Sequence, residues 1–265
     1  MFPKLLSLDG FFLPTYGILM AVAFLLGLWM ASRLARRSGI GPELATNLGV
    51  YAALAGLLGA KLMMLVVHSD YYRRQPEEIF SLATLQAGGV YHGGLAAALL
   101  VGYVYMRAKR MPVLKTLDAF APAIALGYVF GRLGCFAAGC CWGLECHRPW
   151  AVTYTDPEAN RLVGVPLNVP LHPTQLYLAG ASLVIFAVLY RRFRSAHRAG
   201  SVMGLYLVLY AIARFLIDFY RDYDAPAPFG GPLEITQWIA LGLLGAGIWL
   251  MVKPSPARSV LKPSL

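Results

Sequence analysis

Seven stretches of mainly apolar residues, called windows below, occur along this chain of 265 residues. A segment needs about 20 residues to cross a hydrocarbon layer of roughly 30 Å as a helix. Backbone groups in lipid must be hydrogen-bonded within their own segment, and no ten-residue alternating pattern indicates a barrel. We therefore predict an all-α polytopic membrane protein with about seven transmembrane helices. The windows are residues 15–31, 46–67, 88–106, 116–136, 172–190, 201–219 and 233–251.

Composition supports this class. Hydrophobic residues make up 58% of the chain and charged residues only 14%, which excludes an ordinary water-soluble domain. The formal net charge is +10, but Lys and Arg occur in short clusters between the windows rather than along one face. Anionic head groups of the lipid bilayer are therefore the expected counterpart, and no nucleic-acid partner is expected.

The basic clusters also predict an orientation. Of the 23 Lys and Arg residues, 14 follow the first, third, fifth and seventh windows. Loops rich in Lys and Arg stay in the cytoplasm. The N-terminus is then expected outside and the C-terminus in the cytoplasm.

One integral membrane domain is expected for the whole chain. Residues 137–171 are rich in turn-forming and polar residues, and we expect them to form a small extracytoplasmic head. Residues 252–265 are expected to form a cytoplasmic tail. Asp9, Gly10 and Pro14 interrupt the apolar sequence before the first window, so we expect that window to stay in the mature protein.

Two arginines lie within the apolar windows. Arg132 and Arg214 would each cost at least ~3 kcal/mol at bilayer depth, so each requires a partner or a water-lined position. Asp218 stands four residues after Arg214 and could form a structural ion pair with it, whereas Arg132 has no carboxylate at that spacing. The alternative is that both guanidinium groups hold a phosphate, which suits their forked geometry.

Several polar residues mark the starts of windows. His92 is flanked by glycines, which predicts a broken entry to the third window that lines a cavity; the histidine is then a base, a phosphate contact or a satisfied structural residue. His172 opens the fifth window, where Thr174 can cap the helix and Gln175 and Tyr177 act as interfacial groups or as substrate contacts. Tyr16 has the same two interpretations in the first window.

Four ordered motifs, together with Tyr16-Gly17, resemble those of the bacterial prolipoprotein diacylglyceryl transferases. The resemblance covers nearly the whole chain. The motifs are Tyr91-His92-Gly93-Gly94-Leu95, Gly131-Arg132-Leu133-Gly134 followed by Phe136 and Trp142-Gly143, His172-Pro173-Thr174-Gln175-Leu176-Tyr177, and Arg214-Phe215-Leu216-Ile217-Asp218-Phe219-Tyr220-Arg221.

This resemblance implies an enzyme of the bacterial inner membrane. Such an enzyme transfers the diacylglyceryl group of phosphatidylglycerol to the lipobox cysteine of prolipoproteins, forming a thioether and releasing glycerol phosphate. Arg132 and Arg214 would hold the lipid phosphate, and His92 would assist thiol deprotonation. No metal and no soluble cofactor are implied. The other expected substrate contacts are Tyr16, Gly93, Gly94, Gly143, His172, Gln175, Tyr177, Asp218 and Arg221.

The chain departs from the family pattern in two places. The usual stretch Asn-Phe-Ile-Asn-Gly-Glu is replaced by residues 135–140, which read Cys-Phe-Ala-Ala-Gly-Cys, and Leu178 stands where the family usually has a glutamate. Two amides and two carboxylates are therefore absent. This leaves two alternatives open: a divergent paralogue that acts on another lipid or acceptor, and a non-catalytic lipid-binding or transport protein.

All four cysteines lie close together in the sequence, and three interpretations remain open. Disulfides of Cys135 or Cys140 with Cys146 would staple the head in an oxidising compartment. Zinc binding by cysteines together with His147 is a second possibility, although the spacing is unusual. Free thiols are the third, either packed or reactive. A reactive thiol would favour a covalent lipid-enzyme route. The cysteines are Cys135, Cys140, Cys141 and Cys146.

Overall fold

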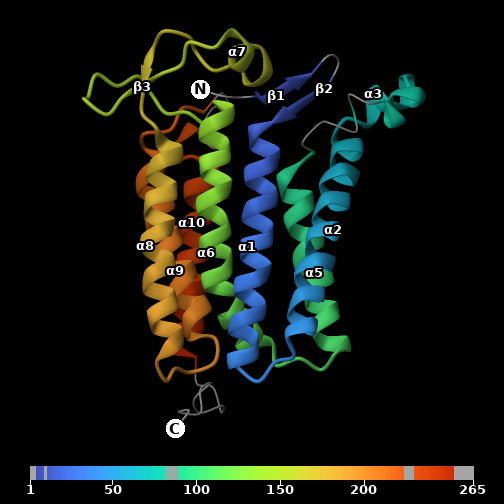
Figure 1. Ribbon diagram of the computed structural model, residues 1–265, viewed down its shortest axis with the longest axis vertical. Coiled ribbons are helices and arrows are strands. Elements are labelled where there is room, and N and C mark those ends of the chain that lie inside the picture. The colour runs from blue at the N-terminus through green and yellow to red at the C-terminus, as the bar shows by residue number, and fades with distance from the viewer. Residues whose placement is uncertain (1–3, 9–10, 82–83, 85–88, 224–229, 254–265) are drawn as a thin grey trace.

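The computed structural model describes residues 4–8, 11–81, 84, 89–223 and 230–253, and most of this part of the chain is helical (Figure 1). The long helices are α1 (Thr15–Arg37), α2 (Pro42–Val67), α5 (Tyr91–Ala108), α6 (Val113–Ala138), α8 (Thr174–Arg194), α9 (Ser201–Asp218) and α10 (Ile235–Val252). The short elements are β1 (Lys4–Leu8), β2 (Phe11–Pro14), α3 (Ser69–Arg74), η1 (Pro76–Phe80), β3 (Val152–Thr153), α7 (Pro157–Val163) and β4 (Pro170–Leu171). The sequence patterns did not predict β1 and β2, which pair antiparallel.

Six of the described helices are long and apolar enough to cross a membrane, namely α1, α2, α6, α8, α9 and α10. The prediction of an all-α polytopic membrane protein is therefore confirmed. The remaining expected span, residues 88–106, forms α5. This helix falls outside the set of six because Tyr91, His92 and Arg107 lower its mean hydropathy. Most helices extend a few residues beyond their apolar windows, since polar and charged residues continue the backbone ladder.

Helix direction brings distant parts of the sequence to one end of the bundle. The starts of α1, α5, α8 and α10 and the ends of α6 and α9 lie at the end that carries the head (Figure 1). Helix α6 packs against α1, α8 and α9, while α2 and α5 pair with each other beside α1. Tyr16, His92, Arg132, His172 and Arg214 therefore lie toward the same end.

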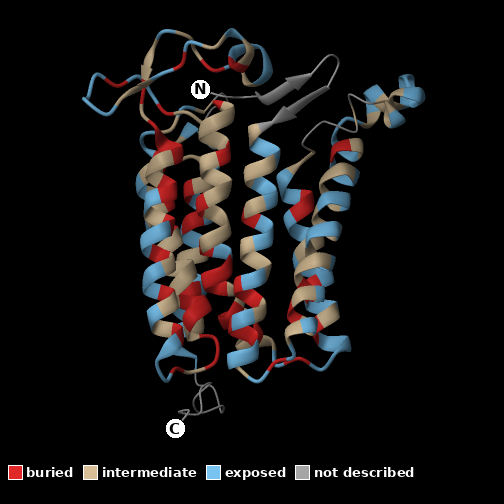
Figure 2. Ribbon diagram, in the orientation of Figure 1, coloured by how far each residue is buried: buried red, intermediate tan, exposed pale blue. Residues whose placement is uncertain are grey.

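The main apolar core lies toward the opposite end. Leu34, Ala119, Leu189 and Val202 are fully buried where α1, α6, α8 and α9 converge, and Figure 2 shows buried residues gathered there. Large apolar side chains on the outer faces, such as Leu58, remain exposed. A continuous exposed apolar surface of this kind is suited to lipid contact.

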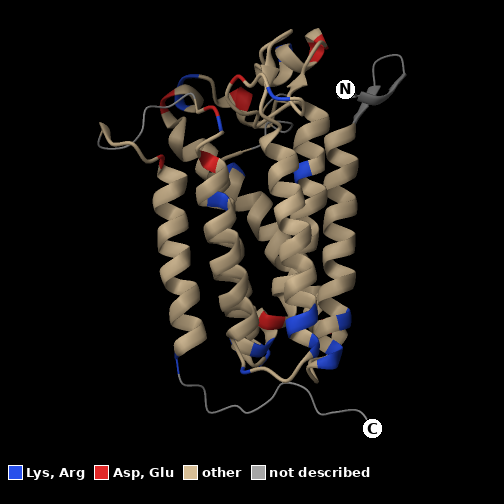
Figure 3. Ribbon diagram, turned by 90° about the vertical axis from the view of Figure 1, so that its left-hand side faces the viewer, with Lys and Arg blue, Asp and Glu red and all other residues tan. Residues whose placement is uncertain are grey.

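Many of the Lys and Arg residues gather at the same end as this core (Figure 3). They include the last-turn arginines of α1, α5 and α8. This distribution agrees with the charge pattern from which we expect these ends in the cytoplasm. The orientation itself stays a prediction.

The head connects the end of α6 at Ala138 with the start of α8 at Thr174. Its small core consists of Tyr154, Ala159, Val165 and Leu171, all buried, and β3 pairs antiparallel with β4. This is the segment for which an extracytoplasmic head was expected from residues 137–171, and its side of the membrane stays a prediction. Of the expected tail, residues 252–265, all but the first two lie outside the described residues.

Helices α2 and α5 approach closely through glycines. A Cβ atom on Gly93 would lie 2.3 Å from Cβ of Met63 and 2.6 Å from the carbonyl oxygen of Gly59. Gly94 faces the carbonyl oxygen of Gly56 in the same way, at 2.8 Å. Small residues at a helix interface allow such approach in membrane proteins. The structure thus gives Gly93 and Gly94 a packing role, and their expected substrate contacts stay predictions.

We expect Gly93→Ala to destabilise the protein, because the added methyl group would push α2 away from α5. Overpacking of this kind costs about 1–3 kcal/mol. Thermal unfolding in detergent should show a lower midpoint. Gly242→Ala is the matched control, because nothing lies within 4 Å of the Cβ that it would add. Equal midpoints for the two variants would contradict the packing role.

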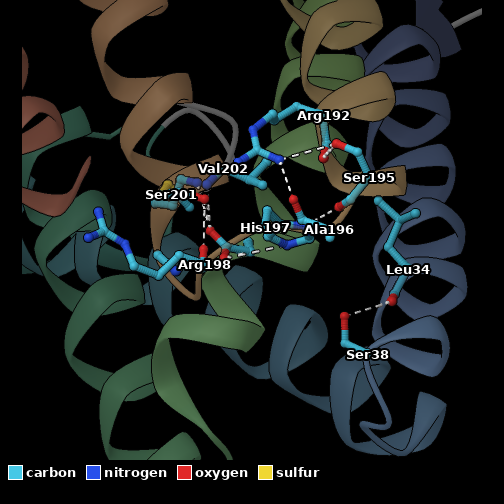
Figure 4. A network of polar contacts seen from close by, with 12 residues as sticks. Leu34, Ser38, Arg192, Ser195, Ala196, His197, Arg198, Ser201 and Val202 are labelled. Atoms are coloured by element: carbon cyan, nitrogen blue, oxygen red, sulfur yellow. Dashed lines mark hydrogen bonds and ion pairs between the residues drawn. The ribbon is translucent and has the colours of Figure 1, made fainter. Parts of the chain in front are cut away.

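A buried carboxylate holds the start of α9. Asp118 of α6 accepts hydrogen bonds from the backbone N–H groups of Gly200 (2.6 Å), Val202 (3.0 Å) and Met203 (2.8 Å). Gly200 has no side chain with which to cap the helix, so a residue from another helix serves instead. Figure 4 shows the loop that leads to this helix start, in which His197 lies 2.8 Å from the carbonyl oxygen of Ser195.

Asp118→Ala should lower stability by about 3 kcal/mol, because three buried N–H groups would lose their charged acceptor. Urea or thermal unfolding of the purified protein measures this loss. Glu77→Ala, at an exposed position, serves as the control and should change little. A similar small effect for Asp118→Ala would show that the loop does not depend on this carboxylate.

Candidate functional site

Arg132 lies near the end of α6 and contacts tyrosines. Its guanidinium carbon lies 4.7 Å from the ring centroid of Tyr128, and Nη2 donates a hydrogen bond to the Tyr128 hydroxyl. That hydroxyl lies 3.4 Å from the hydroxyl of Tyr210 on α9. Sequence reasoning missed Tyr128, although its spacing of four residues before Arg132 was a usable signal. Arg132 has no carboxylate ion pair among the described residues.

Arg214 forms the ion pair that its sequence spacing indicated. Its Nη2 lies 3.1 Å from Oδ1 of Asp218 and donates to the Tyr223 hydroxyl at 2.8 Å. The buried Asp218 carboxylate also accepts hydrogen bonds from Tyr223 (2.8 Å) and Thr236 (2.6 Å). In contrast, Nη1 of Arg214 is buried without a hydrogen-bond partner among the described residues. One edge of the guanidinium is therefore held, and the other keeps buried hydrogen-bond donors that no described residue uses.

Tyr91 at the start of α5 lies near both arginines. It is close enough to Tyr128, Arg132 and Arg214 to interact electrostatically with all three. Both arginines therefore lie within electrostatic range of the start of α5. His92, the next residue, is exposed, and its ring lies 5.7 Å from that of Tyr91. No contact connects His92 with either arginine in the described part of the chain, so its catalytic role stays a prediction.

Three cysteines come together where α6 ends. Gly139 ends the helix in the left-handed conformation (φ 81°). Cys141, two residues later, also adopts the left-handed conformation (φ 61°). This double turn returns the chain toward Cys135, so that the sulfur atoms of Cys135, Cys140 and Cys141 all lie within 4.8 Å of one another. A left-handed non-glycine residue costs about 1 kcal/mol or more, and such strain often occurs at functional sites.

The first turn of α8 holds this loop in place. The Thr174 hydroxyl donates to the carbonyl oxygen of Cys141 at 2.8 Å, and Nε2 of Gln175 donates to that of Cys140 at 2.7 Å. Gln175 also contacts the Tyr154 hydroxyl at 3.1 Å and is fully buried. The expectation that Thr174 caps its helix is wrong, because Pro173 is the N-cap residue and the threonine hydroxyl bonds to the cysteine loop instead. The contacts of Gln175 described here are internal, and its substrate contact stays a prediction.

Gly143 joins the head to α8 and α9. Its N–H donates to the carbonyl oxygen of His172 at 3.0 Å, and a Cβ here would lie 2.3 Å from the carbonyl oxygen of Tyr220. Only glycine fits so close an approach. The His172 ring packs on that of Tyr220 with centroids 5.0 Å apart, and its Nδ1 lies 3.0 Å from the Tyr177 hydroxyl. These contacts bring Arg221, next to Tyr220, beside the cysteine loop.

Cys146 and His147 lie apart from the other cysteines. All four cysteines are unpaired, and the buried Cys146 donates its N–H to the carbonyl oxygen of Pro170 at 2.8 Å. The expected disulfide of Cys146 with Cys135 or Cys140 is therefore not formed. His147 is exposed and lies 3.3 Å from Glu145, so the zinc site that includes this histidine is wrong. The turn at Gly139 and Cys141 separates these residues from the three clustered sulfur atoms.

A cavity of about 230 Å³ opens beside the cysteine loop. Nε of Arg221 is buried without a hydrogen-bond partner among the described residues, and its guanidinium carbon lies 4.9 Å from the Tyr223 ring centroid. Tyr16 is close enough to Arg132 and to the three clustered cysteines to interact electrostatically with them. The cavity is lined by Cys140, Cys141, Trp142, Val163, Arg221, Asp222 and Tyr223.

The thiols within this cluster differ in acidity. Hydrogen bonds from Cys135 and Cys140 lower the pKa of the Cys141 thiol, and the positive charges of Arg221 and Arg132 lower it further. Hydrogen bonding to Cys135 and Cys141 raises the pKa of Cys140. The loop therefore favours one negative sulfur next to two cations.

A larger cavity, of about 570 Å³, lies far from these residues. It is formed by Trp29, Ser32 and Thr46 together with the arginines near the end of α1. Those arginines belong to the basic cluster that we expect at the cytoplasmic surface, where anionic head groups would be their partners. The smaller cavity, which is lined by Cys140, Cys141 and Arg221, is the better candidate for chemistry.

Comparisons with known proteins show the family of this chain. Residues 3–253 match the model of a family described as prolipoprotein diacylglyceryl transferase. A phosphatidylglycerol–prolipoprotein diacylglyceryl transferase of Clostridium tetani is 30% identical over 248 residues, covering 94% of this chain and 96% of that protein. The protein of the same name from Nitratidesulfovibrio vulgaris is 33% identical over 244 residues, covering 90% and 88%. Because these matches span nearly the whole chain, the protein belongs to the prolipoprotein diacylglyceryl transferase family.

Proposed function

We propose that this protein transfers the diacylglyceryl group of phosphatidylglycerol to the lipobox cysteine of prolipoproteins. The observation that carries the proposal is a pair of buried guanidinium nitrogen atoms, Nη1 of Arg214 and Nε of Arg221, that have no hydrogen-bond partner within the described part of the chain. Buried N–H donors on a charged group require an acceptor, and a phosphodiester supplies one with matching charge. Membership of a transferase family favours catalysis over transport or passive lipid binding.

The reaction is a thiol alkylation. The sulfur of the acceptor cysteine attacks the diacylglyceryl carbon that carries the phosphate. A sulfur–carbon bond forms as the carbon–oxygen bond breaks, and the electron pair leaves on the oxygen of glycerol phosphate. His92 is proposed to accept the thiol proton, which passes to the leaving phosphate. A thiol with a pKa near 8.5 needs such help at neutral pH.

The arginines stabilise the charge that develops on the leaving group. Arg132 would contact the phosphate while Tyr128 supports it, and Arg214 would contribute its open edge. Asp218 and Tyr223 hold the other edge of Arg214, so the guanidinium does not need to reorganise during reaction. Preorganised positive charge of this kind commonly contributes 10²–10³-fold to a rate. Tyr16 and Arg221 complete the proposed lipid phosphate pocket.

The orientation proposed from the basic clusters suits this reaction. It puts the head and the cavity on the outer side of a bacterial cytoplasmic membrane, where a secreted lipoprotein precursor would arrive. Phosphatidylglycerol would enter from the bilayer itself. The acceptor peptide would approach from the head.

A second candidate function is the same type of transfer with a different lipid donor or a different acceptor. The arginines would again hold the phosphate of the donor. Two of the three clustered cysteines favour this candidate, because Cys135 and Cys140 stand where the family pattern usually has an amide and a carboxylate. The acceptor or the lipid of this chain would then differ from those of its relatives.

The test uses purified protein, phosphatidylglycerol labelled in its acyl chains, and a lipobox peptide. We expect labelled peptide with the wild type and at least about 100-fold less with Arg132→Ala, because the phosphate loses positive charge. His92→Gln should also lower the rate. Arg161→Ala is the matched control: this arginine is exposed in the head and paired with Glu158, so transfer should be unchanged.

If the wild-type protein transfers no label to the peptide, lipobox acceptors are excluded. Label on another supplied thiol would then support the second candidate. Equal transfer by Arg132→Ala and the wild type would contradict the phosphate role of Arg132. Binding of labelled lipid without any transfer would favour a non-catalytic protein.

A further inference from the structure

The strongest observation that the proposed function does not use is the cluster of Cys135, Cys140 and Cys141. Their sulfur atoms lie within 4.8 Å of one another. Tetrahedral Zn²⁺ with sulfur at about 2.3 Å separates its sulfur ligands by about 3.8 Å. The sulfur–sulfur distances in the cluster therefore exceed those of a tetrahedral zinc site by no more than about 1 Å. A disulfide requires only two sulfur atoms, at about 2.05 Å, and would leave the third without a role.

The backbone around the cluster is already organised as a ligand loop. Gly139 and Cys141 turn the chain back on α6, and the side chains of Thr174 and Gln175 hold the carbonyl oxygens of Cys141 and Cys140. Outer contacts of this type orient the ligands of known metal sites. Gln175 is fully buried, so the loop is tied to the interior of the protein rather than to solvent.

The surroundings also match the charge of a thiolate site. Three thiolates with one Zn²⁺ carry a net charge of about −1. Arg132 and Arg221 lie close enough to Cys141 to interact electrostatically, so the positive charge needed for balance is already present. Thiolate ligands select zinc and other soft ions over Mg²⁺ or Ca²⁺.

We propose that Cys135, Cys140 and Cys141 bind one Zn²⁺ ion, whose fourth coordination position takes the thiol of the acceptor. Two of these cysteines and Arg221 line the cavity beside the loop, which gives a ligand access to that position. Three protein ligands with one open position are typical of catalytic rather than structural zinc. The family resemblance implied no metal, and it is the replacement of family amide and carboxylate groups by cysteine that creates this site.

This role rests on the proposed function. A thiol coordinated to zinc is held deprotonated, and its sulfur remains a nucleophile. The proton released on binding passes to water, and the later bond changes are those given for the transfer reaction. The cation therefore performs the thiol activation, and its ligands Cys135 and Cys140 stand where the family pattern has an amide and a carboxylate. No oxidant or reductant is needed.

Metal content tests the site directly. Full-length protein is purified in detergent, loaded with Zn²⁺ and freed of excess ion, and should then hold about one zinc per chain. Replacement by Co²⁺ should produce sulfur-to-cobalt charge-transfer absorption. Cys135→Ser, Cys140→Ser and Cys141→Ser should each lower zinc affinity about tenfold or more. Cys146→Ser is the matched control, because it removes a buried thiol outside the cluster and should bind zinc normally.

Less than about 0.1 zinc per loaded wild-type chain, or a cobalt spectrum without sulfur bands, would overturn the proposal whatever the variants do. A loss of zinc in Cys146→Ser equal to the loss in the three cluster variants would also overturn the proposal. Thermal unfolding of each variant separates loss of ligand from loss of fold. The wild-type cobalt spectrum tests the site even if every cluster variant misfolds.

The transfer assay distinguishes this proposal from the proposed function. Chelation should lower transfer to the lipobox peptide about 100-fold, and added Zn²⁺ should restore it. Transfer that resists chelation but is lost in Arg132→Ala would overturn the catalytic zinc and leave the proposed function standing. Stoichiometric zinc without transfer to any lipobox peptide would support the metal site and reject that acceptor.

Discussion

A guanidinium group keeps its charge inside a membrane protein, and the end of the bundle that carries the head is arranged around this constraint. Arg132 is supported by the hydroxyl and ring of Tyr128. Arg214 is held by Asp218 and Tyr223. These partners satisfy one side of each cation. What remains open on Arg214, and on the neighbouring Arg221, is a set of donors suited to an anionic ligand.

The two ends of the bundle perform different tasks. At one end, small and aliphatic residues of α1, α6, α8 and α9 form a close core, and Asp118 locks the start of α9 against α6. At the other end the same helices carry tyrosines, arginines and thiols in place of these small and aliphatic residues. Helix α5 reaches this region because glycines let it lie tightly against α2. Rigid support at one end therefore positions polar groups at the other.

The cysteine loop is the part in which this chain differs most from the family pattern. Its conformation depends on contacts from three directions: the end of α6, the first turn of α8, and the segment after α9. Gly143 is the point at which these segments meet, and its lack of a side chain is required there. Because the loop is fixed from all three sides, its sulfur atoms are presented together next to Arg132 and Arg221. A change of residue type at these positions can therefore change the chemistry without changing the fold.

Hydropathy in the sequence was enough to determine a helical membrane protein and the places of its helices within a few residues. The spacing of Arg214 and Asp218 indicated their ion pair as one of two interpretations, and the structure contains that pair. Each of these depends on neighbours along the chain, either through apolar length or through one helical turn. The tertiary structure alone decided that Thr174 holds the cysteine loop rather than capping α8, that Gly93 packs against α2, and that Cys146 lies apart from the other thiols. Those outcomes depend on contacts between residues far apart in sequence, which no local pattern specifies. The cluster of three sulfur atoms arises for the same reason, since two left-handed turns and the side chains of another helix are needed to bring them together.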